Sequence, residues 1–444
     1  MLSASIFLLA FLSACLLAVA RHPIFGLLGY VLVYFVHPPT QWWGSYLPNL
    51  RWSLLAAGIT AVSLVIHHGK LTTESKLINS VFVVMGLFIA WLGIQKFWAL
   101  DQVFHAELLD FYVKYTIAMV LIYKSIDNEE HLKLFLWAHF LGCVYFGWNA
   151  LFLYDGGRFE RFGGPGFSDA NYAGIQSVVA IYVAAGLFLV GNRWQRITIA
   201  CLVPLIVNGL VTTASRSSFL AMIMGGIVFV VFSPKRYRAP AIALGIVGLL
   251  GFSALSHDAY WERISSILYA GEEVQGVDTG ASRVAIWAAQ VEMMNDYPLG
   301  CGHRCTNTLS PNYIEDRYLS GPPGLRGRSS HNTYLTILVE QGMVGGIFIA
   351  LLLLWLLRTS LKLRKNVMSQ DKFLLGVYPS AIAILSAFLV ADMFVDYLKM
   401  EVRMWYIMML LVILKIAKKN AETHNAEAPE PVVSSREIHQ ANPA

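Results

Sequence analysis

Apolar segments of helical length recur along this chain and constrain its fold more than any other feature. A hydrocarbon core of about 30 Å needs roughly 20 mainly apolar residues per spanning helix, with every backbone polar group satisfied inside the protein. Two of the candidate segments, 24–36 and 110–123, are short, so we expect about 12 to 13 transmembrane helices. The candidate segments are residues 2–20, 24–36, 52–67, 77–94, 110–123, 131–153, 172–190, 197–213, 218–232, 239–256, 332–357, 376–393 and 404–417.

The composition agrees with this interpretation. Of the 444 residues, 56% are hydrophobic and 14% are charged, whereas about a quarter of a soluble globular protein is charged. We therefore predict an all-α, polytopic membrane protein. The segment 2–20 has no basic region before it and no clear cleavage site, so it is expected to be a retained helix and not a signal peptide.

The distribution of Lys and Arg predicts the orientation of the chain. When the segments alternate across the membrane, most basic residues fall on one side, in clusters such as 235–238 (KRYR) and 358–365 (RTSLKLRK). The positive-inside rule makes that side cytoplasmic. The long loop 257–331 then lies outside the cytoplasm. The N-terminus is external with 13 spans and cytoplasmic with 12, and both arrangements stay open.

Four regions follow from this topology. Residues 1–256 form N-terminal transmembrane helices, 257–331 a large external loop, 332–417 C-terminal transmembrane helices, and 418–444 a polar, disordered cytoplasmic tail. The external loop is expected to carry two amphipathic helices, each able to lie along the membrane surface. Their apolar stripes are Ile264, Ile267 and Leu268 in 259–270, and Val284, Trp287, Ala288, Val291 and Met294 before Pro298.

Two cysteines of the external loop can form a disulfide, because that compartment is oxidising. Cys301 and Cys305 flank His303, which also makes a candidate metal-ligand set. Three ligands so close together without a second cluster are a weak signal for a metal site. We expect neither a metal nor a cofactor.

The stretch RGRSSHNTYLTILVEQGMVGG (326–346) passes from this polar loop into an apolar segment that is expected to continue to Leu357 without a break. His331 thus lies where water meets the membrane, and Glu340 lies well inside the segment. Such a place suits an ionisable side chain that acts on a polar substrate carried by a lipid. The structural alternative is that His331 caps a helix or is a satisfied polar residue.

A second polar stretch, DGGRFERFGGPGFSDANYAG (155–174), lies on the same side of the membrane. Asp169 is placed to cap a helix that starts near Asn171. Capping does not explain Arg158 and Arg161, which lie beside a Gly-rich turn and together could hold an anion.

A third stretch, TTASRSSFL (212–220), places Arg216 at the external membrane boundary. An arginine there can simply extend to the interface, but ionisable residues near membrane depth are otherwise functional candidates. The neighbouring Ser215, Ser217 and Ser218 favour a polar pocket.

Arg216, Arg283 and His331 would together suit the transfer of a sugar from a lipid diphosphate. Guanidinium groups bind phosphate oxygens bidentately and stay charged at any relevant pH. They would also stabilise the charge that develops on a departing diphosphate. A neutral histidine can accept a proton from an attacking hydroxyl group.

Four stretches in order resemble the bacterial O-antigen ligase/polymerase family of membrane glycosyltransferases. They are FGGPGFSDANYAG (162–174), ASRSSFL (214–220), ASRVAIWAAQVEMMNDYPLGCG (281–302) and SHNTYLTILVEQGMVGG (330–346). Their spacing and the late position of the large external loop also match that family. RHPIFGLLGYVLVYFVHPP (21–39) is similar to a ligase-like branch associated with exosortase systems. One departure is that ASR (281–283) lacks the glycine often found before this arginine.

The resemblance implies a GT-C-type helical fold and a metal-independent, inverting glycosyl transfer at the external face. The donor would be a glycan on undecaprenyl diphosphate. By this likeness His331 is the general base that activates the acceptor hydroxyl, and Arg216 and Arg283 hold the diphosphate. Further candidates for the substrate pocket are Arg161, Asn171 and Asn332.

The expected function is that of an O-antigen ligase, which transfers a lipid-linked polysaccharide to the lipid A core in lipopolysaccharide biosynthesis. A polymerase would extend another lipid-linked repeat unit, and a protein O-oligosaccharyltransferase would modify Ser, Thr or Tyr. A lipid-linked glycan transporter, from a different class, would also need arginines but has less need of a histidine at a helix mouth. We expect a multi-pass protein of the bacterial inner membrane whose partners are the lipid-linked donor, a glycan or protein acceptor and membrane lipids, but no nucleic acid.

Overall fold

The computed structural model describes residues 2–70, 80–256, 258–265, 281–320, 326–367 and 372–427. Every regular element among them is a helix, and one isolated β-bridge pairs Ser320 with Gly327. The α-helices are α1 (Leu2–Ala20), α2 (Ile24–Val36), α3 (Trp52–Ile66), α4 (Ser80–Gln95), α5 (Gln102–Ser125), α6 (Glu129–Leu153), α7 (Ala170–Val190), α8 (Arg193–Thr213), α9 (Arg216–Phe232), α10 (Lys235–Leu255), α11 (Asp258–Ser265), α12 (Ala281–Asp296), α13 (Cys305–Leu309), α14 (Thr333–Glu340), α15 (Gly342–Val367), α16 (Lys372–Ala391) and α17 (Glu401–Glu427).

Every apolar segment expected to span the membrane contains an α-helix. In the described part of the chain, 7 helices are long and apolar enough to cross a membrane, namely α1, α6, α7, α8, α10, α15 and α16. Helices α2, α3, α4 and α9 are apolar but shorter. The prediction of an all-α, polytopic membrane protein is confirmed.

Side-chain caps fix where many of these helices begin. The expected cap at α7 is confirmed, because an Asp169 carboxylate oxygen accepts a hydrogen bond from the Asn171 backbone N–H at 2.7 Å. Such a cap satisfies one of the backbone donors that the first helical turn leaves unpaired. The same role is played by Asp101, Asn128, Asn192, Ser215 and Asn332.

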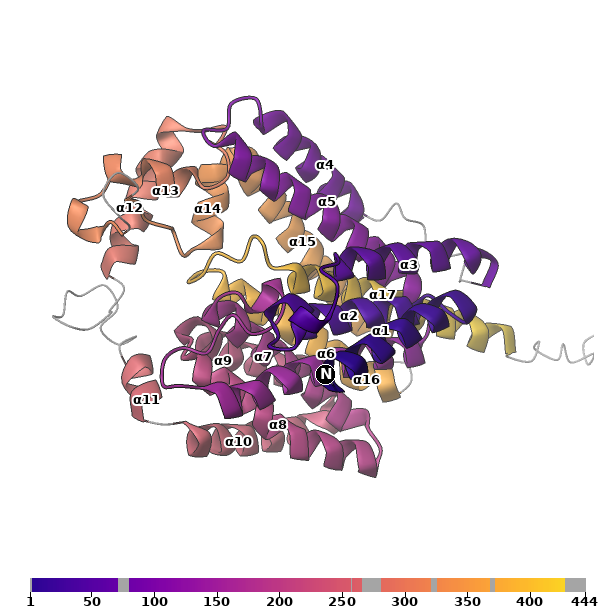
Figure 1. Cartoon of the computed structure of the whole chain (residues 1–444). Helices are drawn as coiled ribbons and strands as arrows, with labels where there is room; N and C mark the ends of the chain where they lie inside the picture. The colour runs from indigo at the N-terminus through magenta and orange to yellow at the C-terminus, as the bar shows by residue number, and fades with distance from the viewer. Residues whose placement is uncertain are drawn as a thin grey trace, which may run out of the picture.

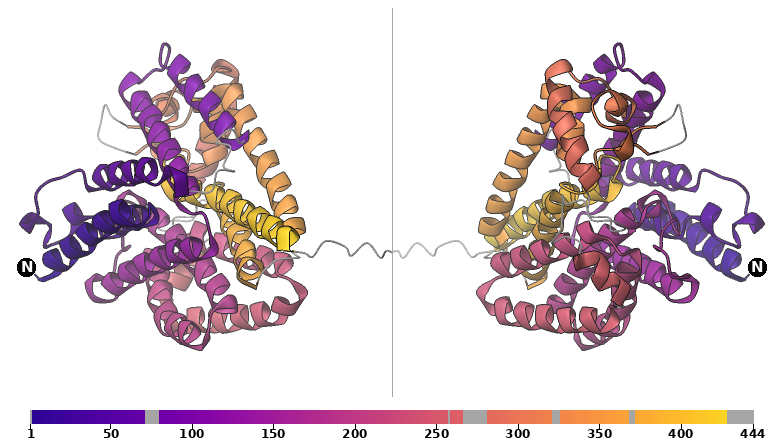
Figure 2. Two further views of the ribbon diagram at one scale, coloured as in Figure 1. Left: turned by 90° about the vertical axis from the view of Figure 1, so that its right-hand side faces the viewer. Right: turned by 90° about the vertical axis from the view of Figure 1, so that its left-hand side faces the viewer.

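The core lies around α7 and α16, which pack against each other and are the most buried spans. Figure 2 shows α17 (yellow) crossing the middle of the bundle, between α4, α5 and α15 on one side and α7, α8 and α10 on the other. By contrast, 11% of the apolar window of α10 is buried within the protein. The outer face of α10 therefore faces lipid in a membrane.

One expectation about the last part of the chain is wrong. The apolar segment after His331 is not one continuous helix, because α14 ends at Glu340 and α15 begins at Gly342. Gly342 has φ +70°, a left-handed conformation that favours glycine. A Cβ there would lie 2.3 Å from the Leu299 carbonyl carbon, so the loop after α12 packs directly into the break.

That loop satisfies the end of α14. The backbone N–H of Gly302 donates to the Glu340 carbonyl at 2.9 Å, and the Gln95 amide donates to the same oxygen at 2.7 Å. The Trp91 indole N–H donates to the Gln341 carbonyl at 3.0 Å. A helix end inside the protein needs such partners, and here they come from α4 and the 297–304 loop.

The buried face of α12 also differs from the expected stripe. Val284 and Val291 are exposed, at 51% and 56% of their surface. The residues of α12 that are buried against the Cys301–Cys305 segment and Val339 are Ile286, Ala289 and Met293, and Trp287 and Met294 of the expected stripe pack at the edge of this cluster. Helix α12 thus packs on the segment that follows it in the chain, which the spacing of apolar residues alone does not reveal.

Helix α11 is described as far as Ser265, and Ile267 and Leu268 of the expected stripe lie outside the described residues. Helix α17 continues to Glu427, ten residues beyond the expected end of the last span at 417. The expected cytoplasmic tail therefore begins as a helix, and its remainder from 428 lies outside the described residues.

The end of the bundle that holds the α5–α6 turn carries a small polar cluster. Asp127 in this turn accepts from His131 Nδ1 at 2.6 Å and lies 3.6 Å from His22 Nε2. Burial raises the pKa of Asp127, but the hydrogen bonds from His131 and His22 outweigh it and lower the pKa. The described residues hold this one three-residue group that could bind a metal ion. His22 Nδ1 accepts from the Ile24 N–H at 3.2 Å, so the proton of the His22 ring lies on Nε2. A protonated Nε2 favours an ion pair with Asp127 over a metal site.

Candidate active site

The loop between α16 and α17, residues 392–400, connects the polar stretches that the sequence singled out. The Thr333 backbone N–H donates to the Asp392 carbonyl at 2.8 Å, and its hydroxyl donates to the Val395 carbonyl at 2.9 Å. The Tyr397 N–H in turn donates to the Thr333 hydroxyl at 2.9 Å. The loop thereby fixes the first residue of α14, two positions after His331. Figure 1 shows this loop (yellow) at the same end of the bundle as α12, α13 and α14.

The same loop holds the beginning of α7. The Tyr397 hydroxyl donates to the Asn171 carbonyl at 3.0 Å, and the Tyr172 hydroxyl donates to the Asp396 carbonyl at 2.7 Å. The rings of Tyr172 and Tyr397 lie 5.1 Å apart. Two tyrosines therefore place Asn171 beside the loop that also fixes α14.

Asn171 connects this arrangement to α9. Its side-chain oxygen accepts from the Ser215 hydroxyl and from Arg158 Nη2, both at 3.0 Å. Ser215 is the N-cap of α9, whose first residue is Arg216. A Cβ on Gly174 would lie 2.5 Å from the Ser218 hydroxyl oxygen, so α7 approaches the start of α9 closely.

Arg216 therefore occupies a helix N-terminus, where the backbone dipole already favours negative charge. A guanidinium group there is not stabilised by the helix itself. An anion held at that place would interact favourably with both the arginine and the backbone N–H groups of the first turn.

Helix α12 brings its arginine to the same loop. Arg283 Nη1 lies 3.5 Å from the Phe394 carbonyl oxygen, at the outer limit of a hydrogen bond. One turn later, the Trp287 indole N–H donates to the Ser330 carbonyl at 2.9 Å. Arg283 and Trp287, one helical turn apart, are thus directed at the loop and at the residue before His331.

His331 is half-buried between two anchored residues. The Ser330 hydroxyl donates to the Gln290 side-chain oxygen at 2.7 Å, and the Asn332 side chain caps α14 by accepting from the Leu335 N–H at 3.0 Å. His331 itself has φ +53°. A non-glycine residue in this left-handed region is strained, by about 1–3 kcal/mol, and such strain is concentrated at functional sites. Ala214, two residues before Arg216, has φ +47°.

A polar cavity of about 170 Å³ has Ser330, the residue before His331, in its wall. Burial of the Asp396 carboxyl group is the main reason that its pKa is raised to about 6, and the nearby Glu340 carboxylate is the second reason. The cavity is lined by His303, Arg304, Thr306, Asn307, Ser329, Ser330, Thr336, Glu340, Asp396 and Lys399. Hydroxyl, carboxyl and basic groups surround this space almost entirely.

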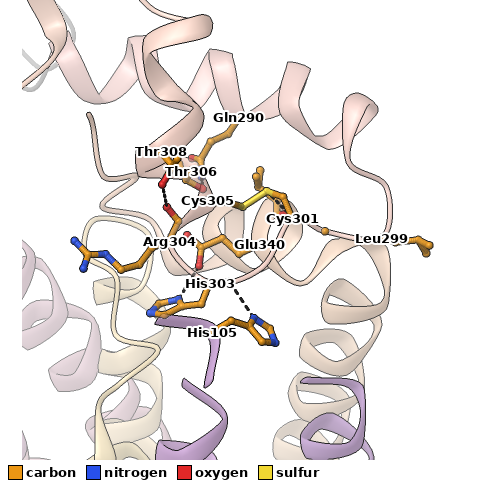
Figure 3. The surroundings of a disulfide bond; sticks show 12 residues. His105, Gln290, Leu299, Cys301, His303, Arg304, Cys305, Thr306, Thr308 and Glu340 are labelled. Carbon is orange, nitrogen blue, oxygen red and sulfur yellow. Dashed lines mark hydrogen bonds and ion pairs between the residues drawn. A yellow bond between two sulfur atoms is a disulfide. The ribbon is translucent and has the colours of Figure 1, made fainter. Parts of the chain in front are cut away.

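One wall of the cavity is a buried, hydrogen-bonded histidine–carboxyl pair that sequence reasoning did not predict. His303 Nδ1 lies 2.8 Å from a Glu340 carboxylate oxygen (Figure 3), and both side chains are nearly inaccessible. The His303 backbone N–H donates to His105 Nδ1 at 3.1 Å, and His105 Nε2 lies 2.8 Å from the Leu92 carbonyl oxygen. Burial lowers the pKa of His105, which agrees with a neutral ring that accepts at Nδ1. The available signal was Glu340, an ionisable residue inside an apolar segment.

Cys301 and Cys305 form a disulfide next to the His303–Glu340 pair (Figure 3). The bond consumes both thiols, so the Cys301, His303, Cys305 set offers no thiolate ligands for a metal. The disulfide instead holds the loop that carries His303 against α14, where Cys301 N–H donates to the Val339 carbonyl at 3.2 Å.

An apolar cavity of about 90 Å³ adjoins the same region within the bundle. Most of its wall consists of side chains such as Met85, Phe88, Phe348, Leu352 and Phe388. Its charged members are Asp392 and Arg403, which are joined by an ion pair, and Thr333, Tyr112 and Tyr334 also line it. A mainly hydrophobic cavity therefore adjoins the residues that the 392–400 loop fixes.

Of the six residues proposed from the sequence, five lie on the elements that this loop or its neighbours hold. They are His331, Arg216, Arg283, Asn171 and Asn332. Arg161 differs, because its side chain is 81% exposed and lies 3.4 Å from Glu160. The 392–400 loop itself was not singled out from the sequence.

Comparison with known proteins gives one match. Residues 199–350, about a third of the chain, match a protein-family model described as O-antigen ligase. This segment includes α9, α12 and α14, and with them Arg216, Arg283 and His331. A search of curated proteins finds no match.

Proposed function

We propose that this chain is a glycosyltransferase that moves a glycan from undecaprenyl diphosphate to an acceptor outside the cytoplasm, and the match of residues 199–350 to the O-antigen ligase family model supports this proposal. The observation that carries this proposal is the 392–400 loop, which contacts the start of α7, the residue after Asn332 and Arg283. One loop thus gathers three polar stretches that are far apart in the sequence.

The donor is held by two kinds of surface. The apolar cavity takes part of the isoprenoid chain, because most of its wall is hydrophobic and its charged groups are confined to Asp392 and Arg403. The diphosphate binds Arg216 and Arg283, since guanidinium groups pair bidentately with phosphate oxygens. The N-terminus of α9 adds backbone N–H groups beside Arg216.

Transfer then proceeds by one displacement. The acceptor hydroxyl oxygen attacks the anomeric carbon while the bond from that carbon to the diphosphate oxygen breaks, which inverts the configuration. His331 takes the proton of the hydroxyl, a contribution of roughly 10²–10⁴-fold. Arg216 and Arg283 stabilise the negative charge on the leaving diphosphate, so the step is proposed to need no metal ion.

The acceptor proposed first is the lipid A core, which makes the chain an O-antigen ligase of the bacterial inner membrane with its site on the periplasmic side. A polymerase or a protein O-oligosaccharyltransferase would use the same donor chemistry. A lipid-linked glycan transporter would use the arginines and the apolar cavity. It would have no use for a strained histidine beside a polar cavity of about 170 Å³, and this favours the enzyme.

The test is a transfer assay with the purified protein and a lipid-diphosphate glycan, offered lipid A core, a second lipid-linked repeat unit or a Ser/Thr/Tyr peptide in separate reactions. A product of lipid A core with the added glycan is the expected result. Lengthening of the donor would replace the ligase by a polymerase, and modified peptide by an oligosaccharyltransferase. Donor binding without transfer to any acceptor would overturn the enzymatic proposal in favour of a transporter.

A further inference from the structure

Two polar side chains in the wall of the polar cavity are buried without a partner. Thr336 Oγ1 and His303 Nε2 are covered from solvent, and neither has a hydrogen bond within the described residues. Thr336 is 2% exposed and His303 is 4% exposed. Leaving a buried polar group unpaired costs about 1–3 kcal/mol, and native proteins rarely tolerate it without a reason.

The chemistry of His303 is defined by its neighbour. A Glu340 oxygen lies 2.8 Å from Nδ1, so in the neutral ring the proton is on Nδ1 and Nε2 carries a lone pair. Histidines paired in this way with a carboxylate are held in one tautomer and one orientation. His303 Nε2 is thus held in place without a partner among the described residues. A hydroxyl group of a ligand would supply that partner.

The rest of the wall has the same character. Asp396 and Glu340 offer carboxylate oxygens, Arg304 and Lys399 offer cationic donors that balance these two carboxyl groups, Thr306, Ser329 and Ser330 offer hydroxyls, and Asn307 offers an amide. Apolar side chains are missing from this lining, so the cavity does not suit an aliphatic or aromatic side chain of a peptide. Closely spaced donors and acceptors around a small volume suit a compact molecule with several hydroxyl groups.

From these observations we propose that the polar cavity is the acceptor subsite of this protein and binds one neutral, polyhydroxylated sugar ring, with His303 and Thr336 as specificity-determining residues. The inference rests on the proposed function. It adds that the acceptor is a glycan and not a protein side chain. The position of Ser330 in the cavity wall places the bound sugar next to His331, where one of its hydroxyl groups would be activated.

The test is Thr336→Val, a change that removes the hydroxyl and keeps the shape. The probe is the deacylated lipid A core oligosaccharide, and its Kd is measured on the full-length protein without donor. We expect Thr336→Val to raise this Kd about five- to tenfold, because a hydrogen bond made only in the complex is lost. Thermal stability should not fall, because the hydroxyl has no partner in the free protein.

A matched control is available on α16. The Ser380 hydroxyl is also buried and has no partner among the described residues, but it lies outside the cavity. Ser380→Ala should leave the Kd of the oligosaccharide unchanged. An unchanged Kd in Thr336→Val, or an equal rise in Ser380→Ala, would overturn the subsite. So would a Ser/Thr peptide that binds when the oligosaccharide does not.

The binding measurement also separates the two proposals. If the oligosaccharide binds in a Thr336-dependent way but the transfer assay yields no product, the subsite stands and the glycosyltransferase proposal fails. If transfer to lipid A core occurs with the same acceptor KM in Thr336→Val and in the unaltered protein, the enzyme stands and the subsite fails.

Discussion

The hydroxyl of Tyr397 donates a hydrogen bond to the backbone carbonyl of Asn171 at 3.0 Å, joining residues 226 positions apart in the sequence. Through this bond the loop after α16 holds the start of α7, and through Asn171 it reaches the cap of α9. The proposed donor site and the proposed base are thus positioned by one loop.

Tyr397→Phe tests this connection. The change removes the donor and leaves the Asn171 carbonyl without this partner, a loss of about 1–3 kcal/mol. We expect a lower Tm and a several-fold lower transfer rate, measured by thermal unfolding and by the transfer assay. Tyr406→Phe is the control, because the Tyr406 hydroxyl is buried without a partner among the described residues. Equal losses in both variants would show that any buried tyrosine hydroxyl has this effect and that the Tyr397 bond is not special.

Arg216→Lys tests the diphosphate contact. Lysine keeps the positive charge but lacks the planar fork that pairs with two phosphate oxygens. We expect at least a tenfold rise in the Kd of the lipid-diphosphate donor, with normal folding. Arg193→Lys, at the start of α8, should bind the donor as the unaltered protein does. Unchanged donor binding in Arg216→Lys would mean that Arg216 only extends to the membrane interface.

The membrane helices and their caps could be predicted because both signals are local. Apolar segments have the length of the bilayer, and Asp169 stands directly before the helix that it caps. The 392–400 loop could not be predicted, since three of its contacts are made by the backbone carbonyls of Phe394, Val395 and Asp396. Main-chain groups are the same in every sequence and leave no pattern.

Non-local packing explains the other differences. The break between α14 and α15 depends on the loop around Leu299, about forty residues earlier, which no pattern within 332–357 can show. The buried face of α12 is set in the same way by the Cys301–Cys305 segment. His303 and Glu340 come from separate segments, and their partnership becomes visible only once those segments are folded together.

Replacing both Cys301 and Cys305 by serine tests the role of the disulfide. Opening so short a loop should cost about 2 kcal/mol in the chain-entropy estimate. It should also loosen the His303–Glu340 wall. We predict a lower Tm and weaker binding of the acceptor oligosaccharide, with donor binding retained. Cys201→Ser, at an exposed cysteine of α8, is the matched control. A Tm equal to that of Cys201→Ser would contradict the structural role.

Asp396 predicts a pH dependence of stability. Its pKa of about 6 in the folded protein exceeds the value of about 3.9 expected for an unfolded chain. The folded state therefore binds more protons between these values, and stability falls as the pH rises from about 4 to about 6. Asp396→Asn should remove this part of the pH dependence and raise Tm at pH 7 relative to the unaltered protein. Identical Tm profiles between pH 4 and pH 7 would contradict the buried environment of this carboxyl group.

The central claim is that His331 is the base of a glycosyl transfer, and His331→Asn tests it most directly. Asparagine tolerates the left-handed backbone of this position better than alanine does, and it cannot accept the proton. The measurement is the rate of product formation from a lipid-diphosphate glycan and lipid A core, with His331→Ala alongside and His68→Ala, at an exposed histidine, as the control. We predict that both His331 variants bind the donor normally and lose transfer by at least 100-fold, while His68→Ala stays active. Near-normal transfer by His331→Asn would contradict this claim.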